Sequence, residues 1–148
     1  FFVLADQYFK VAIRTKKRSL LYYIDVDDLK WINDHFGHSE GDQALIAFSS
    51  ILKKTFRESD IIARIGGDEF VVLLESTDEN DEMLITRLHE NIRDYNVKVS
   101  QKYKLLVSVG TARFDPEYPI SIDQLLSKAD ASMYAQKRER RKKNLASG

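Results

Sequence analysis

The strongest constraint on this chain is a pair of apolar segments separated by two glycines and two acidic residues. The stretch ARIGGDEFVVLL, residues 63–74, is rich in β-forming residues on both sides of its GGDE tetrapeptide. Glycine is depleted in strands, and adjacent carboxylates repel each other. Two strands joined by a turn account for this pattern, because Gly-Gly and Gly-Asp pairs are common in hairpin turns. The stretch therefore predicts a β-hairpin whose tip carries Asp68 and Glu69.

The rest of the chain predicts helices interleaved with strands. Residues 20–26, LLYYIDV, are almost continuously apolar, as expected of a strand buried on both faces, and another strand is predicted at residues 104–114. Apolar residues at helical spacing predict helices at residues 2–14, 27–36 (ended by Gly37), 39–56 (with Ser39 as N-cap), 78–96 and 121–143. The resulting order, α-β-α-α-β-β-α-β-α, predicts an α/β (α+β) fold with a mixed central sheet flanked by helices.

Bulk composition narrows the class of protein. The chain has 148 residues, a length that predicts one domain with a substantial core. Its 23 basic residues balance its 23 acidic residues, which argues against a dedicated nucleic-acid binder. The absence of cysteine excludes disulfides and thiolate metal sites, and fits a reducing cytoplasm. No apolar run approaches the roughly 20 residues that span a bilayer. We therefore expect a cytoplasmic domain.

Acidic residues at the ends of the predicted strands suggest a metal site. Asp25 follows five apolar or aromatic residues, and a buried carboxylate is costly unless it is paired or bound to a cation. If the first strand neighbours the hairpin, Asp25 and Asp68 converge, and such oxygen ligands suit Mg²⁺. Gly66 and Gly67 would then leave room for a phosphate group. On spacing alone a polar turn and a metal site are comparable explanations, and Asp25 favours the metal site.

With these residues identified, the sequence resembles the GGDEF family, the diguanylate cyclases. Residues 22–45, YYIDVDDLKWINDHFGHSEGDQAL, resemble the family's IDxDxFKxINDxxGHxxGDxxL block, and residues 57–74 resemble its RxxD and GGDEF block. VSVGTA at residues 107–112 resembles the strand that follows, and ADASMYAQKRERR at residues 129–141 resembles the terminal ADxAMYxAKxxGR element. The four blocks occur in the family's order and spacing.

The resemblance implies a fold and a reaction. The family has a nucleotide-cyclase or polymerase-palm-like domain, and it condenses two GTP into cyclic di-GMP and two pyrophosphates with Mg²⁺ or Mn²⁺. By correspondence with the family's motifs, Asp25 and the backbone carbonyl of Val26 are metal ligands. Asp68 corresponds to a metal ligand and proton acceptor, and Glu69 to the neighbouring carboxylate of the same turn.

Further positions correspond to the family's nucleotide contacts. Asn33 and Asp42 match the pair that recognises the guanine edge. Their chemistry agrees, because an ionised Asp accepts from guanine's N–H donors and an amide can serve guanine's acceptors. Without the resemblance, both residues would be interpreted as helix caps or stops. Basic residues near the phosphates are matched by Lys30, Lys137 and Arg141, and the turn over the phosphates by Gly66 and Gly67. The basic C-terminal segment could also be only a solvated helix end.

Two expectations concern regulation and assembly. Arg57 and Asp60 resemble the family's RxxD inhibitory site, so we expect cyclic di-GMP to be both product and inhibitor; the competing interpretation is a helix-terminal Arg and a strand-leading Asp. One domain carries one guanine site, whereas the product has two equivalent phosphodiester links. The simplest solution is a homodimer in which each domain presents one GTP.

The chain departs from the family pattern at both ends. The family usually opens with a DxLTxLxNRR-like segment, and this chain starts just after it. We therefore expect residues 1–148 to be a single GGDEF domain, truncated at its N-terminus and excised from a larger multidomain signalling protein with an upstream sensory domain. That full-length protein could be attached to a membrane. Near the C-terminus, Arg140 replaces the family's usual Gly, which could change the local turn.

Two other functions compete with an active diguanylate cyclase. The first is a regulatory module that binds GTP or cyclic di-GMP without catalysis. The second is a purine-nucleotide cyclase relative that uses another nucleotide, against which Asp42 argues. The enzyme is favoured because its acidic and guanine-recognising positions are intact, namely Asp25, Asp68, Glu69, Asn33 and Asp42.

Overall fold

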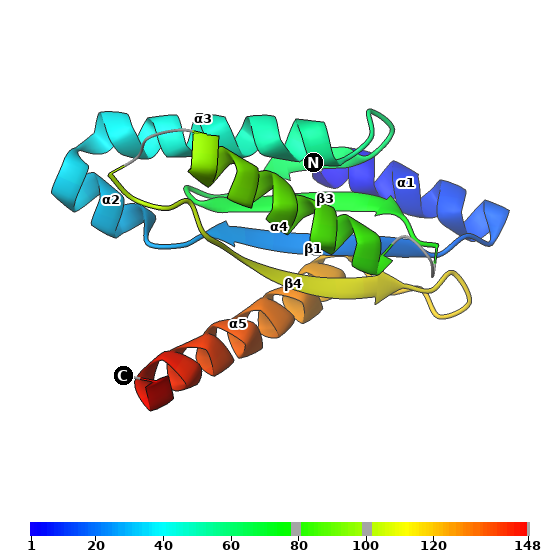
Figure 1. Ribbon diagram of the computed structural model, residues 1–148. Helices are drawn as coiled ribbons and strands as arrows, with labels where there is room; N and C mark the ends of the chain where they lie inside the picture. The colour runs from blue at the N-terminus through cyan, green and yellow to red at the C-terminus, as the bar shows by residue number, and fades with distance from the viewer. Residues whose placement is uncertain (78–80, 99–101, 148) are drawn as a thin grey trace.

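The computed structural model describes residues 1–77, 81–98 and 102–147. Its described part contains a four-stranded sheet and five helices (Figure 1). The elements in chain order are α1 (Phe2–Thr15), β1 (Ser19–Val26), α2 (Leu29–Phe36), α3 (His38–Thr55), β2 (Ile61–Arg64), β3 (Glu69–Glu75), α4 (Asp81–Lys98), β4 (Val107–Phe114) and α5 (Ile122–Ser147). The predicted order of helices and strands is confirmed, although residues 78–80 of the predicted fourth helix lie outside the described residues.

The strands are arranged in the order β2-β3-β1-β4. The predicted α/β class with a helix-flanked sheet is confirmed, but each of the three pairings between the described strands is antiparallel, where a mixed sheet was expected. The reason lies in the hairpin. The chain leaves β1 through two helices and enters β2 at the sheet edge, so the strand that returns beside β1 is β3, which runs in the opposite direction.

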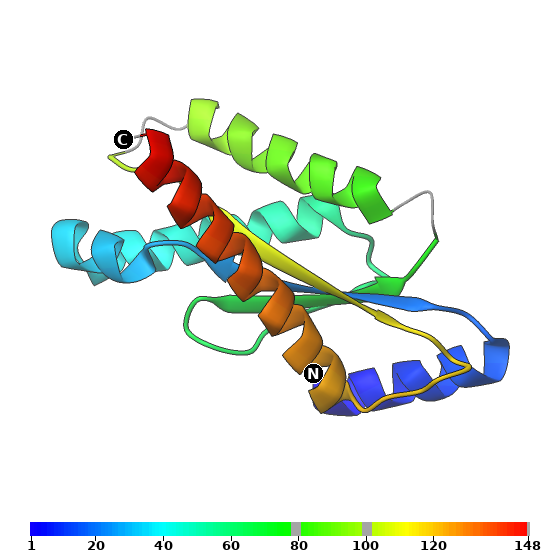
Figure 2. The same ribbon diagram turned by 90° about the horizontal axis from the view of Figure 1, so that it is seen from below.

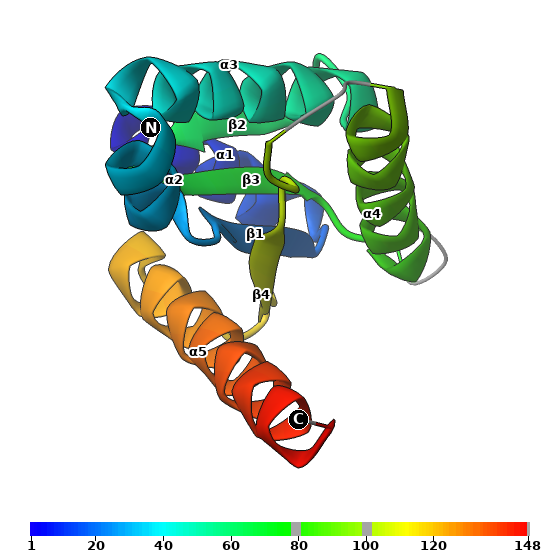
Figure 3. The same cartoon turned by 60° about the vertical axis from the view of Figure 1, so that its left-hand side comes forward.

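Helices cover both faces of the sheet. Leu20, Tyr22 and Ile24 of β1 point toward α3 and α4, whereas Leu21 and Tyr23 point toward α1 and α5. Strand side chains alternate between faces, so one strand supplies both cores, and all eight residues of β1 are buried as expected. Figure 2 shows α5 crossing one face of the sheet, and Figure 3 shows the sheet between α5 and the α3–α4 layer.

Local signals explain most helix boundaries. Gly37 separates α2 from α3 with a φ of 93°, a conformation that glycine adopts without a Cβ penalty. The prediction of Ser39 as an N-cap is wrong, because α3 already begins at His38 after Gly37. Helix α5 starts with a capping box, in which Ser121 Oγ accepts from the Gln124 N–H and Gln124 Oε1 accepts from the Ser121 N–H.

Helix α5 lies directly on β4 at Gly110. A Cβ atom at this position would lie 2.0 Å from the carbonyl oxygen of Ala129 and 2.4 Å from the amide nitrogen of Met133. Only a residue without a side chain permits this approach. Gly110 therefore fixes how closely α5 can pack on the sheet, and hence where its basic segment lies. Among residues 1–77, 81–98 and 102–147, no helix has the length and apolar character that crossing a membrane requires.

Candidate active site

The end of β1 meets the hairpin turn between β2 and β3. Asp25 is opposite Glu69 in the β1–β3 register, and the backbone N–H of Val26 donates to the carbonyl oxygen of Asp68 at 2.9 Å. The side chain of Asp25 lies on the face of β1 that points toward α5, where Lys137 reaches it. The expected convergence of the first strand with the acidic turn is therefore present.

Asp25 is a buried carboxylate with one occupied and one free oxygen. Lys137 Nζ donates a hydrogen bond to Asp25 Oδ2, whereas Oδ1 is buried and has no hydrogen-bond partner among the described residues. Burial raises the pKa of Asp25 to about 6, the neighbouring Asp68 contributes in the same direction, and Lys137 opposes the rise. The site therefore holds negative charge at a cost that an added cation would offset.

This donor set fits a divalent cation bound with water and phosphate. The free Oδ1 of Asp25 and the nearby Asp68 supply two carboxylates, and Val26 supplies backbone at the same strand end. The described residues contain no group of three His, Cys, Asp or Glu side chains suited to a metal. Mg²⁺ commonly uses one or two carboxylates and completes its shell with waters and phosphate oxygens, so two are sufficient.

The side chain of Glu69, which is half-buried, has a hydrogen-bond partner that the sequence did not reveal. Tyr23 donates its hydroxyl hydrogen to Glu69 Oε2 at 2.9 Å. Burial first, and this hydrogen bond second, raise the pKa of Tyr23 above its ordinary value, so the phenol stays a donor. Tyr23 lies two residues before Asp25 on the same strand face, a period-two signal that could have identified it.

The glycine turn is held from within the hairpin by Arg64. Its Nε donates to the carbonyl oxygen of Gly66 at 3.1 Å, and its Nη2 donates to that of Gly67 at 2.7 Å. A Cβ at Gly66 would meet Glu69 Oε2 at 2.9 Å, whereas a Cβ at Gly67 would meet no described heavy atom within 4 Å. The space over Gly67 is therefore not needed by the folded chain, and it is available to a ligand.

Asn33 and Asp42 are brought together at the junction of α2 and α3. A Cβ at Gly41 would lie 1.7 Å from Asn33 Oδ1, so the amide of Asn33 packs on the glycine that precedes Asp42. Asn33 Oδ1 is buried and unpaired among the described residues, whereas Asp42 is exposed. Neither residue is an N-cap or C-cap, because Asp28 and Gly37 hold those positions in α2 and Gly37 precedes α3. The helix-cap interpretation of these residues is wrong.

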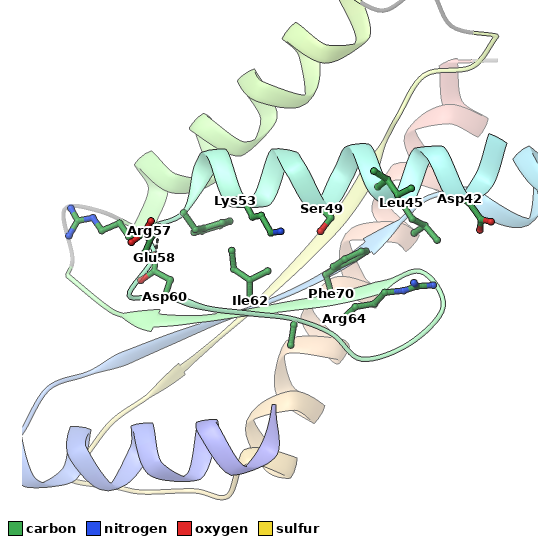
Figure 4. A pocket seen from close by; sticks show the side chains of 13 residues that line it. Asp42, Leu45, Ser49, Lys53, Arg57, Glu58, Asp60, Ile62, Arg64 and Phe70 are labelled. Carbon is green, nitrogen blue, oxygen red and sulfur yellow. Dashed lines mark hydrogen bonds between the residues drawn. The ribbon is translucent and has the colours of Figure 1, made fainter. Parts of the chain in front are cut away.

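A cavity of about 850 Å³ lies between α3 and the β2–β3 hairpin. Figure 4 shows Asp42 and Arg64 at one end and Arg57 and Asp60 at the other. Between them the lining is largely apolar, with Phe70 on the hairpin side. The cavity therefore connects the vicinity of the predicted guanine residues to the predicted inhibitory site.

Arg57 and Asp60 form a tight turn after α3. The Arg57 N–H donates to Asp60 Oδ2 at 2.9 Å, and the Asp60 N–H donates to the Arg57 carbonyl oxygen at 3.0 Å. Burial raises the pKa of Asp60, and Arg57 opposes that rise. Arg87 of α4 lines a second cavity, of about 340 Å³, together with Arg57 and Asp60. Sequence reasoning missed Arg87, because no local pattern connects it to residues 57–60.

The three residues predicted to bind phosphate, Lys30, Lys137 and Arg141, differ in their contacts with the acidic cluster. Lys137 contacts Asp25, whereas Lys30 on α2 and Arg141 on α5 are exposed. Arg140, which was not assigned a role, contacts the strand end instead: its Nη1 lies 2.5 Å from Asp27 Oδ2. Within the described part of the chain, the structure thus joins Lys137 to the acidic cluster, whereas Lys30 and Arg141 are exposed.

Comparison with known proteins gives a consistent result. A family profile described as "Diguanylate cyclase, GGDEF domain" matches residues 2–143. The probable diguanylate cyclase DgcC of Escherichia coli is 35% identical over 126 residues, which cover 84% of this chain and 34% of that protein. The diguanylate cyclase DgcM of Escherichia coli is 38% identical over 128 residues, 85% of this chain and 30% of that protein. The chain thus spans about a third of these relatives.

Solved structures agree with the sequence comparisons. A GGDEF-only fragment of TpbB (YfiN) from Pseudomonas aeruginosa superposes with a TM-score of 0.82 at 28% identity, covering 94% of this chain and 82% of that one. The GGDEF domain of DgcB from Caulobacter crescentus, solved in complex with c-di-GMP, gives a TM-score of 0.78 at 26% identity, covering 90% and 80%. The predicted palm-like cyclase fold is shared with these domains.

Proposed function

The chain belongs to the GGDEF family of diguanylate cyclases, and from that membership we propose that it condenses two GTP into cyclic di-GMP and two pyrophosphates. The observation that carries the proposal is the convergence of Asp25 with Asp68 at the end of a buried strand, where Asp25 Oδ1 has no hydrogen-bond partner in the described part of the chain. Such a carboxylate pair is expensive unless it serves a cation or a reacting group.

The acidic cluster would hold Mg²⁺ or Mn²⁺ through Asp25, Asp68 and the backbone carbonyl of Val26. A bound ion supplies Lewis acidity and offsets charge on the phosphates. Asp68 would accept the proton of the attacking 3′-hydroxyl, and Tyr23 keeps the neighbouring Glu69 in place. Lys137, already directed at Asp25, would stabilise phosphate charge, and Arg141 and Lys30 would assist it.

Recognition of GTP would depend on two further regions. Asn33 and Asp42 would bind the guanine edge, since they adjoin at the α2–α3 junction and Asn33 Oδ1 is unpaired among the described residues. Gly66 and Gly67 would lie under the phosphates, and the open space at Gly67 supports this assignment. An ionised Asp42 only accepts hydrogen bonds. It would therefore select guanine, which offers the N1–H and N2–H₂ donors, over adenine.

Assembly and regulation complete the proposal. Each domain carries one set of these residues, so two domains in a homodimer would each contribute one GTP to the product. Arg57 and Asp60, aided by Arg87, would bind cyclic di-GMP as an inhibitor. The three residues line one cavity, where the arginines can bind phosphate or guanine and the carboxylate can accept from guanine's N–H groups. In a longer protein, an upstream sensory domain would control how the two domains meet.

The deciding experiment is incubation with GTP and Mg²⁺, followed by chromatographic separation of the products. We expect cyclic di-GMP from the wild-type protein and at least about a hundredfold less from Asp68→Asn, as for loss of an acid–base group. Lys142→Ala, an exposed cation on α5, is the matched control and should retain activity. GTP binding without cyclic di-GMP formation, in the full-length protein as well, would instead identify a regulatory module.

A further inference from the structure

We propose that Arg140 is a positioning residue that holds Lys137 on the acidic cluster, acting through Asp27 rather than on the substrate; this rests on the proposed function. Arg140 Nη1 lies 2.5 Å from Asp27 Oδ2, and its Nη2 donates to the Val107 carbonyl oxygen at 3.1 Å. One guanidinium thus joins α5 to the end of β1 and to the start of β4. The fork geometry of Arg permits this double contact, which Lys could not reproduce.

The two acids at the end of β1 have different surroundings. Ser108 Oγ donates to Asp27 Oδ1 at 2.8 Å and Arg140 occupies Oδ2, so both oxygens of Asp27 are used within the chain. Asp25 has one buried oxygen without a partner among the described residues. Asp25 therefore remains available to a ligand, whereas Asp27 is committed to holding α5.

The Asp27–Arg140 contact lies in the part of α5 that extends beyond the hydrophobic core. Met133 is the last buried residue of α5 among those whose side chains the structure describes, so the core no longer holds the helix beyond it. Lys137 and Arg140 are three positions apart and thus share a helix face. The Asp27–Arg140 contact fixes the rotation and position of this face, and Lys137 is thereby presented to Asp25.

A glycine at position 140, which the resembling family usually has, could make neither contact and would weaken the helix, because glycine is a poor helix former. In this chain, Arg140 instead lies inside a continuous helix that extends to Ser147. The side chain of Arg140 is 44% exposed and that of Asp27 only 13%. The ion pair is therefore anchored on the strand side, and its loss should move α5 rather than unfold β1.

The test compares Arg140→Gln, Arg140→Lys, Asp27→Asn and the double variant Asp27→Asn/Arg140→Gln, with Lys142→Ala as the control. The first readout is the Kd for GTP with Mg²⁺, measured by calorimetry. We expect a rise of about threefold to fivefold for Arg140→Gln, within the range of partly exposed ion pairs, and a smaller rise for Arg140→Lys. Asp27→Asn should raise the Kd for GTP by about as much as Arg140→Gln does. The Kd of the double variant should be no higher than that of either single variant, because both substitutions remove the same contact.

The second readout is amide hydrogen exchange of residues 134–141 in the nucleotide-free protein. Exchange there should become faster in Arg140→Gln and Asp27→Asn and remain unchanged in Lys142→Ala. This readout separates the two proposals, because it requires neither GTP binding nor catalysis. A protein that binds no GTP overturns the proposed function, and unchanged exchange in Arg140→Gln overturns the positioning role.

Direct phosphate binding by Arg140 gives a different pattern. Arg140→Gln would then raise the Kd for GTP, whereas Asp27→Asn would leave it unchanged or lower it by freeing the guanidinium. The effects of the two substitutions would not coincide, and exchange of residues 134–141 would not change. Either result overturns the assignment of Arg140 as a positioning residue.

Discussion

Lys137 Nζ donates a hydrogen bond to Asp25 Oδ2, although 112 residues separate the two in the sequence. This contact joins α5 to the end of β1 at the centre of the acidic cluster. Lys137 lowers the pKa of Asp25, but burial and Asp68 dominate and raise it to about 6. The folded protein therefore holds a carboxylate that would be more easily ionised in the unfolded chain.

Asp25→Asn should stabilise the metal-free protein more at pH 8 than at pH 5. The pKa of Asp25 rises from 3.8 to about 6 on folding, so stability is lost as the pH increases through this window. Asparagine carries no such dependence. We expect the gain in unfolding free energy to be about 1 kcal/mol larger at pH 8 than at pH 5, measured by urea denaturation. Equal effects at both pH values would contradict the raised pKa.

Gly110→Ala should destabilise the domain, and Gly67→Ala should not. A Cβ at position 110 would collide with backbone atoms of α5, which cannot move without displacing the helix. The expected cost is about 1–3 kcal/mol in urea unfolding. At position 67 a Cβ meets no described heavy atom within 4 Å, so stability should change little while cyclase activity falls, because the phosphate would need that space. Full activity in Gly67→Ala would contradict the proposal that the glycine turn binds the substrate phosphates.

Gly41→Ala should weaken GTP binding without unfolding the protein. The new methyl group would require Asn33 to leave its place beside Asp42, because the Cβ position lies 1.7 Å from Asn33 Oδ1. We expect the KM for GTP to rise about tenfold, as for the loss of a good base contact. Gln43→Ala, an exposed substitution two positions along α3, should leave the KM unchanged. An unaltered KM in Gly41→Ala would contradict the proposed role of Asn33 in guanine recognition.

Arg57→Ala should raise the inhibition constant for cyclic di-GMP. Arg57 shares its cavity with Asp60 and Arg87, so Arg87→Ala should have a similar effect. We expect at least about a tenfold increase, because each arginine can form charge-assisted hydrogen bonds to phosphate or guanine. Lys54→Ala, an exposed cation on α3, is the control. An inhibition constant that is the same in Arg57→Ala and wild type would disprove the inhibitory site.

Specific activity should increase steeply with protein concentration. Two domains must each present one GTP, so the rate depends on the dimer population, which rises with concentration. Activity measured from about nanomolar to micromolar protein, beside sedimentation analysis, tests this dependence. A specific activity that is constant across the range would be incompatible with assembly of the site from two freely associating chains.

Local sequence patterns predicted the helices and strands and the acidic residues at the ends of the strands. Alternation and helical spacing identified the strands and helices, and the glycines identified the hairpin turn, because these signals depend on neighbouring residues. The acidic residues at strand ends were also recognisable. The prediction at Ser39 is wrong because a hydroxyl near a helix start resembles a cap in the sequence, whereas Gly37 makes the turn before α3.

Tertiary structure decided which distant residues meet. Strand order put β3 beside β1 and made their pairing antiparallel, so Asp68 adjoins Val26. The close approach of α5 at Gly110 directed Lys137 and Arg140, and not Arg141, toward Asp25 and Asp27. Local propensities specify each segment, but contacts between segments a hundred residues apart depend on how complementary surfaces pack. Sequence thus determined which groups are available, and packing alone determined their partners.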